Sequence, residues 1–219
     1  MIPYSSIKIA NWFIYKSIKT GKYLNTLYLI RLVYIAHGWH LSVFNNPLIS
    51  EDVQAWNFGP VIPELYHAMK KFGNDKIKEP LSFIEGDDIN KSSILINDYQ
   101  RNELLEKIWE VYVIDSNEDE IRSISCNENS PWVTRWIEMQ KIRMTQSKID
   151  NNDIKNYFDI IKNKNSTDTK TNGLSIHFNN DEIIEASIFI DKVEIEYIDG
   201  DEIEEAFNKL IYNSGGIRR

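Results

Sequence analysis

Four residues have side chains that could combine in metal binding or catalysis. His37 and His40 are three residues apart, so both can face one side of a helix, and His67 and Cys126 follow at long intervals. Imidazole nitrogens and a thiolate are ligands that zinc prefers, but no spacing joins these four residues into a known zinc pattern. We therefore expect hydrogen-bonded core histidines and no bound metal. Cys126 also lacks the local signature of a catalytic nucleophile.

Other catalytic signatures do not occur in the sequence. The sequence contains no glycine-rich loop for phosphate or dinucleotide binding, no HExxH metalloprotease motif and no GxSxG hydrolase motif. Acidic side chains are plentiful, and their distribution is typical of solvated faces. We expect a protein that is not an enzyme and has no cofactor. The alternative is a metal-dependent enzyme that uses His37, His40 and His67.

Charge is unevenly distributed along the chain. The net charge is -8, and residues 173–219 hold eleven Asp or Glu against four Lys or Arg. Nucleic-acid binding requires a basic face, and the sequence has no dense Lys/Arg cluster, so direct nucleic-acid binding is not expected. An acidic excess favours a partner protein with a basic surface. A homo-oligomer is a further possible assembly.

The location of the protein is predicted from one cysteine and one apolar stretch. A single cysteine cannot form an internal disulfide, and the N-terminus has no secretory signal pattern, so we expect a cytoplasmic protein. Residues 27–44 approach membrane-spanning length but include Arg31, and an arginine near the middle of a span costs roughly 2.5 to 3.5 kcal/mol on insertion scales. This stretch is predicted to be a buried helix, with no membrane span.

The first half of the chain is predicted to form three helices and a small hairpin. Ser5 or Ser6 begins one helix, which Gly21 ends, and Asn25 or Thr26 begins the next, which ends before Pro47. Two short strands are predicted within residues 48–56, around residues 50–52. Pro63 then suits the first turn of a helix that ends at Gly73.

The second half adds helices and an acidic end. Helices are predicted over residues 98–115, from Ser130-Pro131 onward, and over residues 150–162. Residues 163–173 are polar and predict a linker. Residues 184–190 and 193–197 alternate in hydrophobicity and predict a hairpin with an acidic face, followed by a helix. The expected domains are 1–162, a linker 163–173, and an acidic C-terminal module 174–219.

One stretch, QAWNFGPVIPELYH at residues 54–67, concentrates aromatic side chains around a glycine and two prolines. We predict a joint rather than an active-site loop, in which Trp56 and Phe58 pack beneath the bend while Gly59-Pro60 and Pro63 direct the next helix. Tyr66 and His67 are predicted to reach a groove and contact a partner. We also expect this stretch to share one core with RLVYIAHGW, residues 31–39.

RLVYIAHGW at residues 31–39, followed by QAWNFGPVIPELYH at residues 54–67, resembles two motifs of the Panacea domain in their usual order. ISCNENSPW, residues 124–132, is similar to a third family segment that ends in SPW, with Cys126 where a histidine is usual. IDNNDIKNYFDII, residues 149–161, resembles the family's closing helix, so the resemblance covers roughly residues 4–162. The family positions are matched by the residues Tyr34, His37, Gly38, Trp39, Trp56, Gly59, Pro60, Pro63, Pro131 and Trp132.

The resemblance implies a binding protein. Panacea domains occur in antitoxins and in phage and mobile-element proteins, and they neutralise diverse toxins, often translation inhibitors, by direct contact. It implies a mainly α fold, close to all-alpha, with a small β-hairpin. The tail lies outside the resemblance, and the β-hairpin-helix appendage predicted there makes the expected class α+β. The expected partner is a cognate protein toxin, contacted by Tyr66 and His67 and by Glu194, Glu196 and Tyr197 of the tail. The alternative is a phage or mobile-element protein that binds a host factor.

Overall fold

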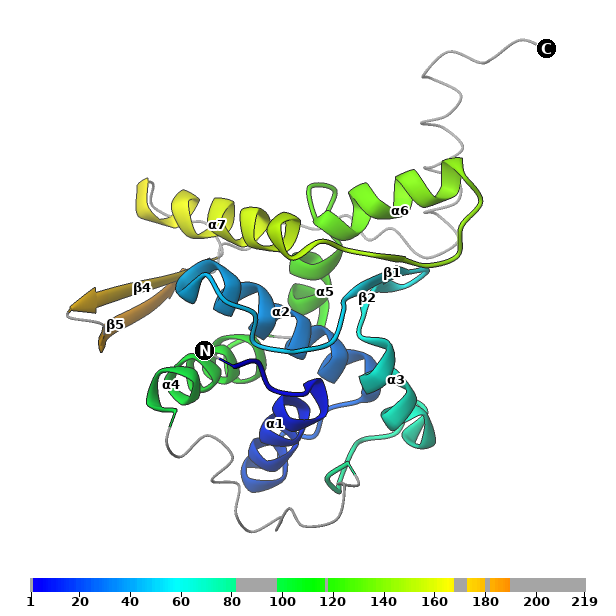
Figure 1. Cartoon of the computed structure of the whole chain (residues 1–219). Coiled ribbons are helices and arrows are strands. Elements are labelled where there is room, and N and C mark those ends of the chain that lie inside the picture. The colour runs from blue at the N-terminus through cyan, green and yellow to red at the C-terminus, as the bar shows by residue number, and fades with distance from the viewer. Residues whose placement is uncertain (1, 82–97, 117, 168–172, 180–181, 190–219) are drawn as a thin grey trace. The chain divides into compact units, whose positions relative to one another are not determined.

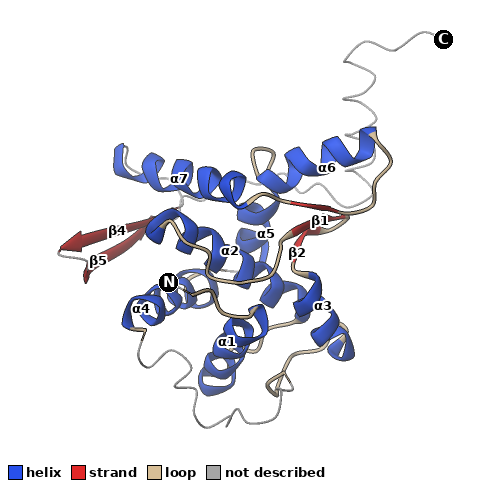
Figure 2. Ribbon diagram, viewed as in Figure 1, coloured by secondary structure: helices blue, strands red, loops and turns tan. Residues whose placement is uncertain are grey.

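A computed structural model describes residues 2–81, 98–116, 118–167, 173–179 and 182–189 of the chain. These residues are mostly helical, with one three-stranded antiparallel sheet and a separate two-stranded hairpin (Figure 2). The mainly α class is confirmed in this coarse form, and the whole is consistent with α+β. The expectation of an all-alpha chain is wrong, because strands pair on both sides of Gln54–Trp56.

The first two helices begin and end where their capping residues predict. Helix α1, Ser6–Thr20, starts at Ser5, whose side chain accepts a hydrogen bond from the backbone N–H of Lys8. Helix α2, Thr26–Phe44, starts at Asn25, which accepts from the N–H of Tyr28 at 2.8 Å. Because the first N–H groups of a helix have no partner inside it, these caps stabilise each start by about 1 kcal/mol.

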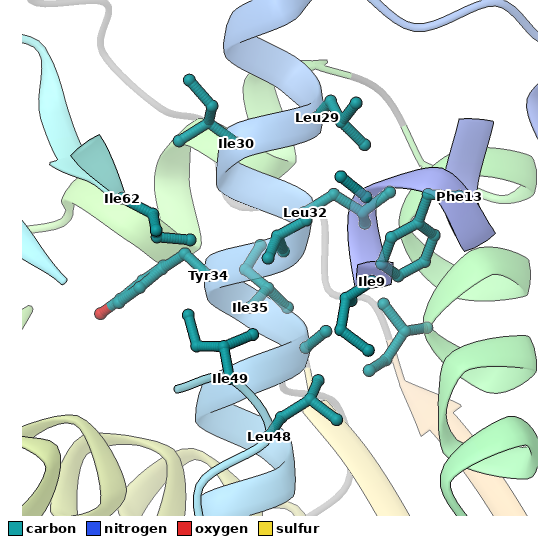
Figure 3. Packing of buried hydrophobic residues seen from close by; sticks show 14 of the residues in the cluster. Ile9, Phe13, Leu29, Ile30, Leu32, Tyr34, Ile35, Leu48, Ile49 and Ile62 are labelled. Atoms are coloured by element: carbon teal, nitrogen blue, oxygen red, sulfur yellow. The ribbon is translucent and has the colours of Figure 1, made fainter. Parts of the chain in front are cut away.

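Helix α2 is the centre of the fold (Figure 1). It contacts α1, α3, α4, α5, α7 and the sheet. Leu32, Tyr34 and Ile35 are fully buried against Ile9 and Phe13 of α1 and against Ile49 and Ile62, as Figure 3 shows. Within the described residues, α2 is the one helix that is long and apolar enough to cross a membrane, but 78% of that stretch is buried inside the protein. It is packed as a core helix.

The small sheet differs from the predicted hairpin. Strands β1, Gln54–Trp56, and β2, Gly59–Val61, pair antiparallel, with Trp56 opposite Gly59. Strand β3, Ser147–Lys148, adds to the other side of β1, giving the order β2-β1-β3. The prediction of two strands within residues 48–56 is wrong, because the turn falls at residues 57–58 rather than at residues 50–52.

The remaining helices follow the sheet in sequence. Helix α3, Pro63–Met69, begins with its proline and continues into the short 3-10 helix η1, Lys70–Phe72. Helix α4, Tyr99–Trp109, is capped by Asp98 and runs into a π-helical turn, η3, Glu110–Ile114. Helix α5, Glu118–Cys126, was not predicted. Helix α6, Pro131–Lys141, has Ser130 as its cap, as predicted.

The C-terminal elements are described only in part. Helix α7, Asn151–Thr167, extends beyond the predicted closing helix into the segment expected to be a linker. Strand β4, Gly173–Asn179, pairs antiparallel with β5, Glu182–Phe189. Strand β5 coincides with the first strand of the predicted hairpin, but its partner precedes it. Residues 193–197 and the final helix, predicted for the acidic module, lie outside the described residues, and the domain division stays a prediction.

At Gly38, a side chain of α7 packs directly on the backbone of α2. A Cβ atom built on Gly38 would overlap the ring of Phe158, which is fully buried between Tyr34 and Trp39. Closely packed interiors leave no space for an added methyl group unless the neighbour moves. The glycine of the RLVYIAHGW segment therefore serves helix packing.

We predict that Gly38→Ala lowers the free energy of unfolding by roughly 1 to 3 kcal/mol, because the added methyl group overpacks the α2–α7 contact. Urea denaturation measures this change. In a Phe158→Leu background, the same substitution should cost clearly less. An equal cost in both backgrounds would show that the two residues do not oppose each other.

Candidate functional site

His37 is a buried hydrogen-bonding hub on α2. Its Nδ1 atom accepts from the backbone N–H groups of Leu48 and Ile49, at 3.3 and 3.4 Å. Nε2 must then carry the proton, and it donates to Oδ1 of Asn151 at 3.0 Å. Each ring nitrogen thus has a protein partner. His37 fastens both the chain after α2 and the start of α7 to the central helix.

His40 has a similar role one turn further along α2. Its Nε2 accepts from Nε of Arg101 at 3.2 Å, so Nδ1 carries the proton and donates to the carbonyl oxygen of Asn46 at 2.6 Å. Arg101 also pairs with Asp98 at 2.9 Å and lies over the ring of Tyr4. This network connects α2, the start of α4 and the N-terminal segment.

Both buried histidines are neutral at physiological pH. Burial lowers the pKa of His37 and of His40 to about 4, because the charged form loses its hydration, and hydrogen bonds to Asn151 and Asn46 only partly oppose this shift. Their ring nitrogens are committed to protein partners, so neither is presented to a substrate.

The residues of the metal alternative are not brought together. His67 is exposed on α3, His37 and His40 are buried on α2, and Cys126 lies at the end of α5. Among the described residues, no group of three His, Cys, Asp or Glu side chains could hold a metal ion. Burial also raises the pKa of the Cys126 thiol, which disfavours the reactive thiolate.

The bend after β1 is fixed from two sides. Gly59 has a φ of 128°, and a Cβ atom there would lie 3.0 Å from Sγ of Cys126, so only glycine suits both the conformation and the space. The largely buried Arg31 of α2 donates from Nη2 to the carbonyl oxygen of Phe58 at 3.1 Å. The 31–39 and 54–67 segments therefore meet in one core, as predicted.

Aromatic side chains continue from this bend across the neighbouring helices. The rings of Trp56 and Tyr66 are 5.2 Å apart, and Nε1 of Trp132 donates to the carbonyl oxygen of Trp56 at 2.8 Å. Trp132 in turn stacks on Trp136 of α6. Bulky rings hold the β1–β2 turn, α3 and α6 together. We call the solvent-accessible rings on these three elements, Trp56, Phe58, Tyr66, His67 and Trp136, the aromatic face.

The structure corrects one residue of the predicted joint. Phe58 does not pack beneath the bend: its side chain is 70% exposed, because it lies at the tip of the β1–β2 turn. Trp56 is partly buried, as is Tyr66, and His67 is exposed. Pro131 and Trp132 are buried at the start of α6. Glu194, Glu196 and Tyr197 lie outside the described residues.

Comparison with known proteins supports the resemblance seen in the sequence. The family described as "Antitoxin SocA-like, Panacea domain" matches residues 29–133, a range that runs from α2 to the start of α6. The Panacea resemblance is thereby confirmed over residues 29–133, a shorter range than the expected 4–162, and it points to a role related to toxin–antitoxin systems. No curated protein and no solved structure matches the chain.

The two buried histidines predict that folding stability falls at mildly acidic pH. Their pKa values in the folded state, about 4, lie below the value of about 6.5 in an unfolded chain. Below that higher value the unfolded chain binds protons that the folded chain does not, so stability present at neutral pH is lost as the pH falls.

Urea denaturation between about pH 7 and pH 5 should show a loss of roughly 2 kcal/mol per histidine. The control is His67→Gln, which removes an exposed histidine and should leave this pH dependence intact. A stability that stays constant over this range would mean that His37 and His40 are not buried in their neutral form.

Proposed function

We propose that this protein is a cytoplasmic antitoxin that neutralises a cognate protein toxin by direct binding and performs no reaction of its own. The family match supports the general role. The finer proposal is supported by two features of the chain: Arg31 and His37 of the RLVYIAHGW segment are used to hold the fold, and aromatic groups of the 54–67 segment reach the surface.

The observation that carries the proposal is the exposed ring of Phe58 on a firmly held turn. Arg31 binds the carbonyl oxygen of Phe58 from below, and Gly59 packs on Cys126. A large apolar side chain 70% exposed at such a position gains little for folding, but it can bury its ring in a partner. Aromatic residues held in place before binding lose little conformational entropy when they bind, and they dominate binding energy in many interfaces.

The flanking residues complete a surface of mixed character. Tyr66 and Trp136 are partly buried, so each presents one edge to solvent while the rest of the ring packs on the protein. His67 adds an exposed polar group beside Tyr66, with the rings 5.6 Å apart. An aromatic centre with a polar rim is the usual composition of a protein interface. A host factor in place of a toxin would use the same surface, and the partner's identity separates the two cases.

We predict that Phe58→Ala abolishes neutralisation, weakening toxin binding by about 2 kcal/mol or more, and leaves the free energy of unfolding nearly unchanged. Tyr99→Ala is the matched control, because Tyr99 is 69% exposed on α4, a helix that lies away from β1, β2 and α3 (Figure 1). Binding to the purified toxin by calorimetry, and rescue of growth, measure the effect. Equal behaviour of the two variants would remove Phe58 from the interface.

The acidic C-terminal residues are proposed to assist this binding by electrostatic attraction. Residues 173–219 carry eleven acidic residues and four basic ones. Toxins that act on RNA or on pyrophosphate donors need cationic active sites, so an acidic segment would accelerate their approach. In this proposal, Glu194, Glu196 and Tyr197 contact the toxin.

We predict that Glu194→Lys combined with Glu196→Lys slows association with the toxin and makes the rate less sensitive to salt, because steering charges act mainly on the association rate. Stopped-flow measurements at low and physiological salt test this. Asp115→Lys with Asp153→Lys, at exposed positions after η3 and on α7, adds the same positive charge and serves as a control for the change in total charge. Rates that respond equally in both variants would show that net charge alone, and not these glutamates, is responsible.

A further inference from the structure

A pocket of about 290 Å³ lies on elements that the aromatic face does not use. It is formed where the turn between α1 and α2 meets the segment after η1 and the π-helical turn η3. The described side chains that line it include Lys22, Tyr23, Leu24, Tyr28, Lys76 and Val113. Its volume is at the lower end of the range of small-ligand pockets, about 300 to 1,000 Å³.

The lining is cationic, although the chain as a whole is acidic. Lys22 and Lys76 face the pocket, and no carboxylate is among its described lining residues. Lys78 lies beside them, with its ammonium group 5.9 Å from the ring centre of Tyr23. Within the described part of the chain, none of these three lysines forms an ion pair. Their positive charge is left available to an anion.

The walls of the pocket are fastened to each other. The backbone N–H of Ile77 donates to the carbonyl oxygen of Leu24 at 2.9 Å, which holds the Lys76 segment against the α1–α2 turn. The hydroxyl of Tyr28 donates to the carbonyl oxygen of Tyr112 in η3 at 2.5 Å. These two bonds join all three walls, so the backbone segments that carry Lys22 and Lys76 are fixed against each other before any ligand binds.

The third wall is an uncommon backbone conformation. Residues Glu110–Ile114 form a π-helical turn, and Val113 from this turn lines the pocket. π-helical turns are rare and occur frequently at functional sites. The turn also places the carbonyl oxygen of Tyr112 where Tyr28 binds it, which shapes the pocket edge.

We propose that this pocket binds a small phosphorylated ligand, with a phosphate group between Lys22 and Lys76. Lysine ammonium groups act as point charges that bind phosphate oxygens without demanding a fixed orientation. The rings of Tyr23 and Tyr28 and the apolar Leu24 and Val113 lie beside these charges, so the non-phosphate part of a ligand has apolar surface to contact. Pyrophosphate and nucleotides share this chemistry.

Titration calorimetry of the full chain tests the proposal with three probes: pyrophosphate, ADP and adenosine. Pyrophosphate and ADP should bind with one site per chain, and adenosine should not bind. Lys22→Ala combined with Lys76→Ala should weaken binding by about tenfold or more, because two charge-assisted contacts are lost. Lys70→Ala with Lys141→Ala, at exposed lysines outside the pocket, should bind as the unaltered chain does.

The comparison of ADP with pyrophosphate also distinguishes a nucleotide from a ligand without a nucleoside. Tighter binding of ADP than of pyrophosphate identifies a nucleotide site, and equal binding identifies a site for the phosphate group alone. The proposal is overturned if neither phosphate compound binds, if sulfate at the same ionic strength competes equally well, or if adenosine binds as tightly as ADP. It is also overturned if the Lys22/Lys76 variant binds as tightly as the Lys70/Lys141 variant.

Discussion

Burial of α2 is the constraint on which the rest of the structure depends. This helix is apolar almost all round, yet it carries polar side chains into the core, where each one needs a hydrogen-bonding partner. Arg31 binds the β1–β2 turn, His37 binds the chain after α2 and the start of α7, and His40 binds Arg101 of α4. Apolar burial stabilises the helix, and these directional bonds specify which segment packs at which level of it.

This arrangement separates the two motif segments by role. The first, RLVYIAHGW, lies within α2, and its histidine and glycine serve hydrogen bonding and helix packing. The second, QAWNFGPVIPELYH, forms the turn and helix that α2 supports, and it carries Phe58 to the surface. A buried frame that holds an exposed aromatic turn is suited to recognising another protein, and the match to the antitoxin-like Panacea family agrees with that interpretation.

The sequence predicted those features of the fold that depend on a few neighbouring residues, such as the starts of helices. Ser130 caps the helix that it was expected to cap, and Ser5 and Asn25 are each one of the two caps expected for their helices, since a cap depends on a few neighbouring residues. Long-range pairing was beyond such signals: β3 joins β1 through the pair of Gln54 and Lys148. The exposure of the Phe58 side chain also depends on the position of the β1–β2 turn, which the sequence did not predict correctly. From its residue type alone, an apolar residue such as Phe58 is expected in the core.

Hydrogen exchange measured by mass spectrometry tests most directly whether this face is where a partner binds. The chain would be compared alone and mixed with the protein encoded by the adjacent gene, the expected toxin. The account predicts slower exchange in peptides that cover residues 54–72 and 130–147, which contain the β1–β2 turn, α3 and α6. Protection confined to other parts of the chain, with these peptides unchanged in a stable complex, would contradict it.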